Sequence, residues 1–242
     1  MITIIFGSNG VGKSSLMNHF LNESAFDHDR IYQGQEEIYW LNQEYGIDIS
    51  TPQHMTYLNG TATFQKDGYD ARENLQLYPE RLGIQSEAPE GVKCQFILPY
   101  ATLGIDEAQT WFSSRDGHVQ NYQFSFFEKH RHNNLNIYMS TTRARLIDLR
   151  IRELAQGMHV LERKIIENKF GSKSIEWTVN LIPVGEIDGY INANPKDRKQ
   201  FAKRAKILCG RDIFEIYDPE SCKKSFYEGF NSADFNFKRK VS

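Results

Sequence analysis

The segment that most restricts the fold of this chain is a glycine-rich turn near its N-terminus, GSNGVGKS at residues 7–14. It matches the pattern G-x-x-x-x-G-K-[ST] at every fixed position. A short apolar run rich in isoleucine, residues 2–6, precedes the turn, and apolar residues recur at helical spacing over residues 14–22. Strand, glycine turn and helix is the context in which such a turn binds phosphate, which disfavours a chance match.

The turn predicts a site for ATP and Mg²⁺. Glycines let the backbone curl so that its N–H groups point at phosphate oxygens, and the following helix adds the positive end of its dipole. In such loops the lysine neutralises the β- and γ-phosphate oxygens, and the next hydroxyl binds Mg²⁺; here these are Lys13 and Ser14. The residues expected to bind the nucleotide are Gly7, Ser8, Asn9, Gly10, Val11, Gly12, Lys13, Ser14 and Ser15.

A second motif is an apolar strand, residues 102–105, that ends in two adjacent carboxylates, Asp106 and Glu107. We expect Asp106 to hold the Mg²⁺ shell, directly or through water, and Glu107 to orient and deprotonate the attacking water. Acids that favour a helix N-terminus are the alternative, which a phosphate loop in the same chain disfavours. A kinase for small molecules does not need a water activator, so the pair favours an ATPase.

A third apolar run, residues 135–139, reads as the next strand and is followed by Ser140, Thr141 and Thr142. Thr141 or Thr142 is predicted to act in catalysis by sensing the γ-phosphate, with ordinary helix capping as the alternative. Several arginines lie near this run, and each is either a solvated side chain or an arginine finger supplied in trans within a ring. These arginines are Arg131, Arg143, Arg145, Arg150 and Arg152.

Alternating strands and helices predict an α/β fold, a P-loop NTPase with a mostly parallel central sheet flanked by helices. A small C-terminal extension with strands and a helix is expected to complete it. The predicted division is an ATPase core over residues 1–156 with an insert at about 23–95, a C-terminal part of the same domain over 157–218, and a tail over 219–242.

Periodicity predicts several further elements. Expected strands cover residues 62–64, 94–98, 158–167, 174–183 and 213–217, with a turn at 169–173. Expected helices cover about 118–130, the stretch around 147–154, and 194–210, where an Asn-Pro pair starts the helix and a glycine ends it.

The predicted helix over residues 194–210 carries six cations and one acid, Asp197. Its buried stripe is expected to be Phe201, Ala205 and Leu208. Such a basic face can contact DNA phosphates or an anionic membrane surface, or can be an ordinary solvated face. The cations are Lys196, Arg198, Lys199, Lys203, Arg204 and Lys206.

Composition narrows the class of protein. Acidic and basic residues nearly balance, 31 against 29, so any contact with nucleic acid must be local. The three cysteines lack the spacing of a zinc site or a disulfide framework, and no secretory signal or run of about 18 apolar residues is present. We therefore expect a cytoplasmic protein with reduced thiols and no transmembrane segment.

Residues 99–115, PYATLGIDEAQTWFSSR, resemble the segment around the second motif of zonular occludens toxin-like proteins. So do the sequence HRH at 130–132, which leads into the third strand, and residues 147–154. These proteins are the assembly ATPases of filamentous phages, in the FtsK–HerA branch of P-loop motors. The resemblance covers residues 1–22 and about 99–155, with a weaker likeness at 214–218.

The resemblance implies nucleotide binding by Gly12, Lys13 and Ser14 and catalysis by Asp106 and Glu107. It implies an oligomer, a ring, that drives phage extrusion through the host inner membrane while it hands over packaged single-stranded DNA. The expected location is then the host bacterial cytoplasm, peripheral to the inner membrane, with phage proteins as partners.

Two departures from the family pattern matter. Family members usually have a glutamine after the third strand, where this chain reads Thr142 and Arg143. They also usually carry a membrane-spanning helix after the ATPase domain, and this sequence has none, so a partner would have to supply the membrane anchor.

Two functions stay open from the sequence. One is a motor for phage assembly or extrusion that acts on a DNA–protein complex. The other is a DNA translocase, packaging ATPase or helicase-like ATPase without a role in extrusion, since residues 106–109 read DEAQ, as in a helicase box. The remaining helicase motifs are absent, which disfavours a helicase. The sequence also lacks the LSGGQ signature, which disfavours an ABC-type module.

Overall fold

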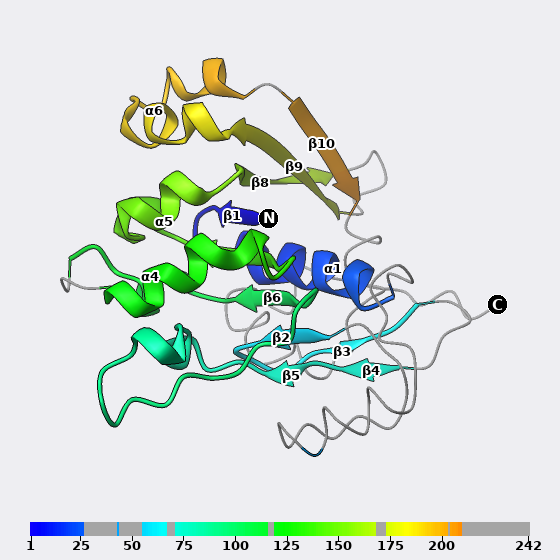
Figure 1. The fold of residues 1–242 in the computed structure, drawn as a ribbon. Helices are drawn as coiled ribbons and strands as arrows, with labels where there is room; N and C mark the ends of the chain where they lie inside the picture. The colour runs from blue at the N-terminus through cyan, green and yellow to red at the C-terminus, as the bar shows by residue number, and fades with distance from the viewer. Residues whose placement is uncertain are drawn as a thin grey trace.

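The computed structural model has an α/β architecture (Figure 1). It describes residues 1–26, 43, 55–66, 71–115, 119–167, 173–202 and 204–209. For residues 166–167, 173–176 and 204–209 it describes the backbone alone.

Most of the described strands belong to one sheet. Its members are β1 (Ile2–Phe6), β2 (Thr56–Leu58), β5 (Leu75–Gln76), β6 (Thr102–Ile105), β7 (Asn136–Thr141), β8 (Gly157–Glu167), β9 (Lys173–Pro183) and β10 (Arg204–Cys209), while β3 (Thr63–Phe64) pairs with β4 (Arg72–Glu73). The order in the sheet is β10-β9-β8-β1-β7-β6-β2-β5. The pairs from β8 to β5 are parallel, and β8–β9 and β9–β10 are antiparallel. The predicted fold class is confirmed.

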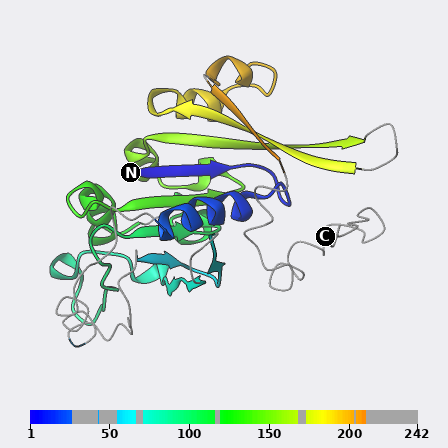
Figure 2. The same cartoon turned by 90° about the vertical axis from the view of Figure 1, so that its right-hand side faces the viewer.

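Helices cover both faces of the sheet. They are α1 (Lys13–Ala25), α3 (Ala108–Trp111), α4 (Asn121–Glu128), α5 (Leu149–Leu154) and α6 (Ile187–Asn192), with short 3₁₀ turns η2 (Pro79–Arg81), η3 (Gln85–Glu87), η4 (Lys129–Arg131), η5 (Ala144–Leu146), η6 (Val184–Glu186) and η7 (Arg198–Phe201). Leu16, Met17 and Leu21 of α1 pack in a core cluster on one face. Phe127 of α4 and Ile151 of α5 belong to the cluster on the other face. Figure 2 shows α1 lying along its face of the sheet.

The apolar run at the N-terminus becomes β1, the central strand, because every side chain from Ile2 to Ile5 is buried. A strand enclosed on both faces needs this continuous pattern, since neither side of it meets water. β1 pairs in parallel with β7 on one side and with β8 on the other. The glycine-rich turn therefore leaves the sheet at its centre.

Gly104 explains how α1 comes so close to the sheet. A Cβ atom at this position of β6 would lie 2.7 Å from Leu21 Cδ1 and 3.0 Å from Leu58 Cδ1. A Cβ atom essentially never lies as close as 2.7 Å to another heavy atom, so a larger residue here would force the buried Leu21 side chain to move. The glycine in this buried strand is thus a packing requirement.

The predicted helix over residues 194–210 is wrong. The chain forms the short turn η7 and then β10, which pairs antiparallel with β9 from Arg204–Leu181 to Cys209–Glu176. A short run of mixed apolar and charged residues fits both the helical period of 3.6 residues and the strand period of two. Here the unpaired edge of β9 decides the outcome, because β10 satisfies its backbone groups.

The predicted strand over residues 94–98 is also wrong, because this segment has no strand pairing. It is held through side chains instead: the Gln95 amide donates to Gln76 O at 2.8 Å and accepts from Tyr78 N at 2.8 Å. The Gln95 N–H donates to Arg81 O at 2.8 Å. Hydrogen bonds of Gln95, and not the strand pairing that the apolar pattern predicted, therefore join this segment to residues 76–81.

The remaining predicted elements divide into two groups. Strands β1, β3, β6, β7, β8 and β9 and helices α1, α4 and α5 lie where the sequence indicated. The predicted strand at 213–217, the tail, His118 and most of the turn at 169–173 lie outside the described residues. The predicted insert contributes β2 and β5 to the main sheet, so this part of it belongs to the core. None of the described helices has the length and apolar character needed to cross a membrane.

His159 is a half-buried titratable group within this fold. It lies on β8, paired with Ile5 of β1 and Leu181 of β9. Its ring packs edge-on against Phe20, with 5.4 Å between centroids, and Nδ1 has no hydrogen-bond partner among the described residues. Burial lowers the pKa of His159 to about 4.

We predict that His159 weakens the fold in acid. The unfolded chain binds a proton at this residue below about pH 6.5, whereas the folded chain binds it only near pH 4. The stability due to neutral His159 is therefore full above about pH 6.5, falls as the pH drops towards 4, and is lost by up to about 3 kcal/mol. Urea unfolding of wild type and His159→Leu across this range should show the variant losing less stability. An equal loss in both proteins would contradict the assignment.

Candidate nucleotide-binding site

The phosphate loop lies between β1 and α1, at the carboxyl edge of the sheet. Gly10 and Gly12 have φ angles of 69° and 100°, in the left-handed region that glycine adopts without strain. Gly12 is the N-cap residue of α1, whose first turn carries no acidic residue. A Cβ atom on Gly12 would lie 2.9 Å from the indole nitrogen of Trp177. Backbone conformation and lack of space therefore both require glycine here.

Lys13 lies inside the loop. Its side-chain nitrogen donates a hydrogen bond to Ser8 O at 3.1 Å, and the residue is 6 % exposed. Burial lowers the pKa of Lys13, while the nearby carboxylates of Glu107 and Asp106 act in the opposite direction. The ammonium group thus lies among the loop's own backbone, where the residues present fit the phosphates of a nucleotide.

The two motifs meet at one hydrogen bond. Ser14 Oγ donates to Asp106 Oδ2 at 2.8 Å, across 92 residues of sequence. Hydroxyl and carboxylate oxygens are ligands that Mg²⁺ prefers, and it usually takes only one or two protein side chains beside phosphate oxygens and water. The pair therefore fits the metal that the sequence predicts.

Asp106 is held by a residue of β7 and by the residue that follows β2. Ser140 Oγ donates to Asp106 Oδ1 and accepts from the Glu107 N–H at 3.2 Å. The Asn59 side chain accepts from Asp106 N at 2.7 Å and donates to Asp106 O at 3.0 Å. Because both backbone groups of Asp106 are bound, the direction of its carboxylate is set by β2 as well as by β6.

Asn59 and Ser140 are the site residues that the sequence analysis missed. Asn59 follows β2 within the predicted insert, and Ser140 belongs to a polar run in which only Thr141 and Thr142 have a predicted role. Their shared position is the signal that could have identified them. Asn59 directly follows β2, Ser140 is the second-last residue of β7, and both strands run parallel to β6. Polar residues at such ends meet at one edge of the sheet.

Glu107 has an unusual backbone conformation for a residue other than glycine, with φ 52° and ψ 47°. Left-handed geometry of this kind is strained and persists where surrounding contacts enforce it. Its N–H group is held by Ser140, and its carboxylate accepts a hydrogen bond from the Gln109 amide. Glu107 is exposed, so its carboxylate is accessible to water.

Thr141 and Thr142 lie at the end of β7 beside this network. Thr141 is fully buried, and its hydroxyl accepts a hydrogen bond from the Arg143 N–H at 3.0 Å. This contact is a local turn bond between Thr141 and Arg143. It is not the helix cap named as the alternative, because the helical turn that follows, η5, has no side-chain capping bond at its N-cap residue Arg143. A sensing role for either threonine stays a prediction, while Ser140 is the residue of this run that contacts Asp106.

Three of the nearby arginines bind other parts of the same chain. Arg145 donates to Asn192, Arg152 pairs with Asp188, and Arg150 donates to Val119 O and pairs with its near neighbour Asp148. Arg143 is exposed and lies two residues beyond β7, at the same edge as the phosphate loop. Of these four, Arg143 is the one best placed for a role in trans.

We predict that Asn59→Ala lowers the free energy of unfolding by about 1–3 kcal/mol, because it leaves two backbone groups of Asp106 without their partner. Urea unfolding measures this loss. The exposed Asn194, replaced in the same way, serves as the control and should change stability by less than about 0.5 kcal/mol. Equal changes in the free energy of unfolding for the two substitutions would show that the Asn59 hydrogen bonds to Asp106 do not stabilise the fold.

Two solved structures are similar to this chain. No curated protein matches the chain. Among solved structures, the N-terminal domain of zonular occludens toxin from Neisseria meningitidis matches with a TM-score of 0.50 and 19 % identity, covering 90 % of this chain and 98 % of that one. The genome packaging NTPase B204 from Sulfolobus turreted icosahedral virus 2, in complex with ATP-gammaS, matches with a TM-score of 0.37 and 10 % identity, covering 85 % and 95 %.

The first of these structures has the same fold as this chain. The model of the Zonular occludens toxin (Zot) family matches residues 61–190, more than half of the sequence, and includes Asp106, Glu107 and Ser140. The chain is thus a P-loop NTPase that belongs to the Zot family.

Proposed function

We propose that this chain is an Mg²⁺-dependent ATPase that serves as a motor for phage assembly or extrusion and acts on a DNA–protein complex. The observation that carries the proposal is the 2.8 Å hydrogen bond between Ser14 Oγ and Asp106 Oδ2. It brings the hydroxyl of the phosphate loop and the carboxylate of the second motif within reach of a single ion. Chance motifs 92 residues apart have no reason to meet in this way.

The chain's own groups divide the work of nucleotide binding. The N–H groups of the loop and of the first turn of α1 bind phosphate oxygens, and Lys13 neutralises their charge. Ser14 and Asp106 would hold Mg²⁺, which when bound neutralises charge on the phosphate oxygens. Ser140 and Asn59 keep Asp106 in place and thereby reduce the reorganisation needed on binding.

Glu107 is the residue we assign to water activation. It directly follows Asp106, it is exposed, and it lies near enough to Lys13 to affect the pKa of that ammonium group. A carboxylate in this position can orient a water molecule and accept its proton. The hydrogen bond from Gln109 restricts the direction of this carboxylate.

The motor role rests on membership of the Zot family and on the resemblance in sequence to phage assembly ATPases. We place the chain in the cytoplasm of the host bacterium, peripheral to the inner membrane, as a ring to which Arg143 of each subunit contributes in trans. Phage proteins and single-stranded DNA are the proposed partners, with the membrane anchor supplied by one of them.

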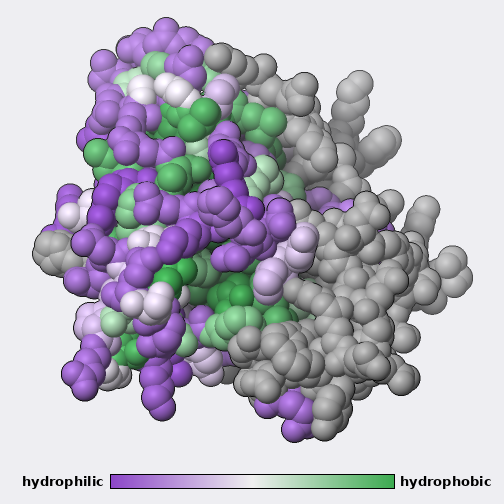
Figure 3. Space-filling view, in the orientation of Figure 1, coloured by the Kyte–Doolittle hydropathy of each residue, from purple (hydrophilic) through white to green (hydrophobic). Residues whose placement is uncertain are grey.

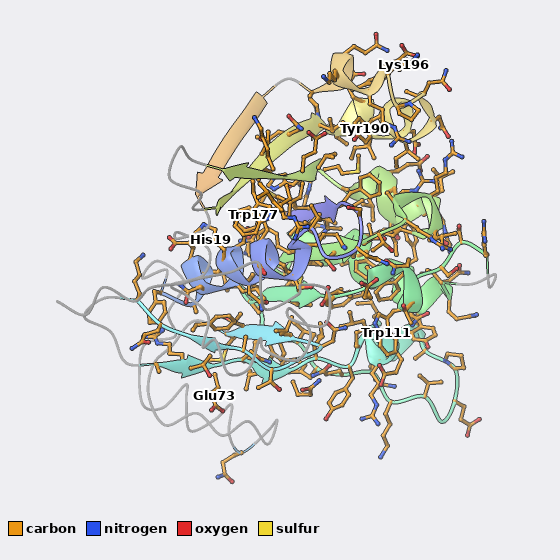
Figure 4. The ribbon with its side chains drawn as sticks, turned by 180° about the vertical axis from the view of Figure 1, so that it is seen from behind. His19, Glu73, Trp111, Trp177, Tyr190 and Lys196 are labelled. Atoms are coloured by element: carbon orange, nitrogen blue, oxygen red, sulfur yellow. The ribbon has the colours of Figure 1, made fainter. Side chains whose placement is uncertain are left out.

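A basic turn offers a place for the DNA or an anionic membrane surface. Lys196 and Lys199 are exposed, and Arg198 lies over the ring of Tyr190 at 5.3 Å. Figure 4 shows Lys196 at the outer end of the molecule, and Figure 3 shows hydrophilic residues at the outer surface of that end, with apolar residues beside them. The second function, a DNA translocase, packaging ATPase or helicase-like ATPase without extrusion, would use the same ATPase site.

We predict that Glu107→Gln lowers kcat for ATP hydrolysis by at least about a hundredfold, since a general base contributes on this scale. The Kd for Mg·ATP should stay within about twofold of wild type, because the substitution keeps the shape of the side chain. Lys13→Ala is the matched control and should lose nucleotide binding itself. Undiminished hydrolysis in Glu107→Gln would overturn the proposed mechanism.

Single-stranded DNA should stimulate hydrolysis by the wild-type protein if it is the polymer that is moved. The measurement is steady-state turnover with and without DNA, together with the particle size in the presence of nucleotide. Stimulation with ring formation would support the DNA motor. Turnover that is indifferent to DNA would favour a motor that works on protein partners at the membrane.

A further inference from the structure

The β8–β9 hairpin extends beyond the strand it packs against. β8 pairs with β1 only from Gly157 to Val160, and its later residues pair with β9 alone among the described residues. Figure 2 shows the two strands continuing past the end of β1. Since the phosphate loop begins where β1 ends, this arm of the hairpin runs beside the loop.

Two side chains of the arm bind the loop's backbone. Arg163 Nη1 donates to Gly10 O at 3.1 Å, and the Trp177 indole N–H donates to Val11 O. Arg163 and Trp177 lie directly opposite each other in the hairpin. Two neighbouring carbonyl groups of the loop are thus held by one cross-strand pair.

Trp177 is also part of the core that carries the loop. It is 1 % exposed and packs in the cluster that contains Val11 and Leu16. Its indole nitrogen would lie 2.9 Å from a Cβ atom on Gly12. Figure 4 shows Trp177 beside α1. The tryptophan therefore contacts the loop by packing as well as by its hydrogen bond.

The direction of these bonds matters for phosphate binding. In a trans peptide the C=O and N–H groups point in opposite directions, and the described chain has no cis peptide bond. Holding Val11 O against the indole turns the Gly12 N–H away from the hairpin. Holding Gly10 O against Arg163 turns the Val11 N–H the same way, towards Ser8 O at 3.4 Å, the oxygen that also accepts from Lys13.

We infer that Arg163 and Trp177 are positioning residues for nucleotide binding. They hold two consecutive carbonyl groups outward, so that the N–H groups of Val11 and Gly12 point into the loop before a phosphate arrives. Preorganisation of this kind raises affinity by reducing the cost of ordering on binding. The inference rests on the proposed function only in that the loop binds a nucleotide.

A neighbouring cation, Lys164, makes it possible to distinguish the effect of the Arg163 hydrogen bond on nucleotide affinity from the effect of positive charge alone. Lys164 follows Arg163 on β8 and is exposed. Because side chains alternate between the faces of a strand, it points away from the face that Arg163 presents to the loop. Removing either cation changes the net charge equally, but only Arg163 bonds Gly10 O.

The test compares Kd values for a non-hydrolysable ATP analogue in wild type, Arg163→Met, Trp177→Phe and Lys164→Met. Loss of one hydrogen bond to the loop should raise Kd about 3- to 10-fold in the first two variants. Lys164→Met should stay within about twofold. Equal increases in Arg163→Met and Lys164→Met, or a lower thermal midpoint with unchanged Kd in Arg163→Met, would overturn the inference. Arg163 is partly exposed, so its variant keeps the test valid if Trp177→Phe does not fold.

Trp177 also supplies a spectroscopic readout. The chain has three tryptophans, so the double variant Trp40→Phe, Trp111→Phe leaves Trp177 alone. Because the inference has the indole bound to Val11 O before the nucleotide arrives, saturating analogue should shift its emission maximum only slightly. A large shift on binding would show that the Trp177 contact forms only with nucleotide and would contradict the inference. Because turnover is not involved, a chain that binds the analogue but does not hydrolyse ATP would contradict the proposed function and leave this inference intact.

Discussion

Parallel pairing of β1, β7 and β6 is the constraint on which the whole site depends. It brings the phosphate loop, Asp106 and Ser140 to the same edge, since Phe6 lies opposite Thr141 and Ile105 opposite Met139. The helix dipole of α1 then points its positive end at that edge. A shift of one residue in either pairing would turn the polar side chains to the opposite face of the sheet and separate Ser14 from Asp106.

Hydrogen bonds from side chains to backbone groups hold the site together at this edge. Asn59 and Ser140 hold the Asp106–Glu107 corner, and Arg163 and Trp177 hold the loop from the other side. Each contact joins segments far apart in the chain, so the loop and the acidic corner are supported by residues in β7, β8 and β9 and by the residue after β2. Support of this kind keeps strained or left-handed residues such as Glu107 and Gly12 in place. It also reduces the ordering that nucleotide binding requires.

Residues 194–209 show where the spacing of apolar residues does not predict secondary structure correctly. Spacing of Phe201, Ala205 and Leu208 suits a helix, yet residues 204–209 form β10. A run of six residues cannot separate the two periods, and the available edge of β9 then outweighs local propensity. The strands over 157–183 are long enough for their alternation to decide, and the prediction agreed with the structure within one residue at each outer end.

The sequence alone determined the phosphate loop, the acidic pair and the α/β class, because each depends on residues adjacent in the chain or on a period sustained over many residues. Tertiary structure alone decided that Asn59 and Ser140 hold Asp106, that Arg163 and Trp177 hold the loop, and that the basic segment after Asn194 is a turn and an edge strand. The side-chain contacts among these join residues 34 to 166 positions apart. The physical reason is that no local pattern encodes which strands become neighbours; register and packing choose the partners.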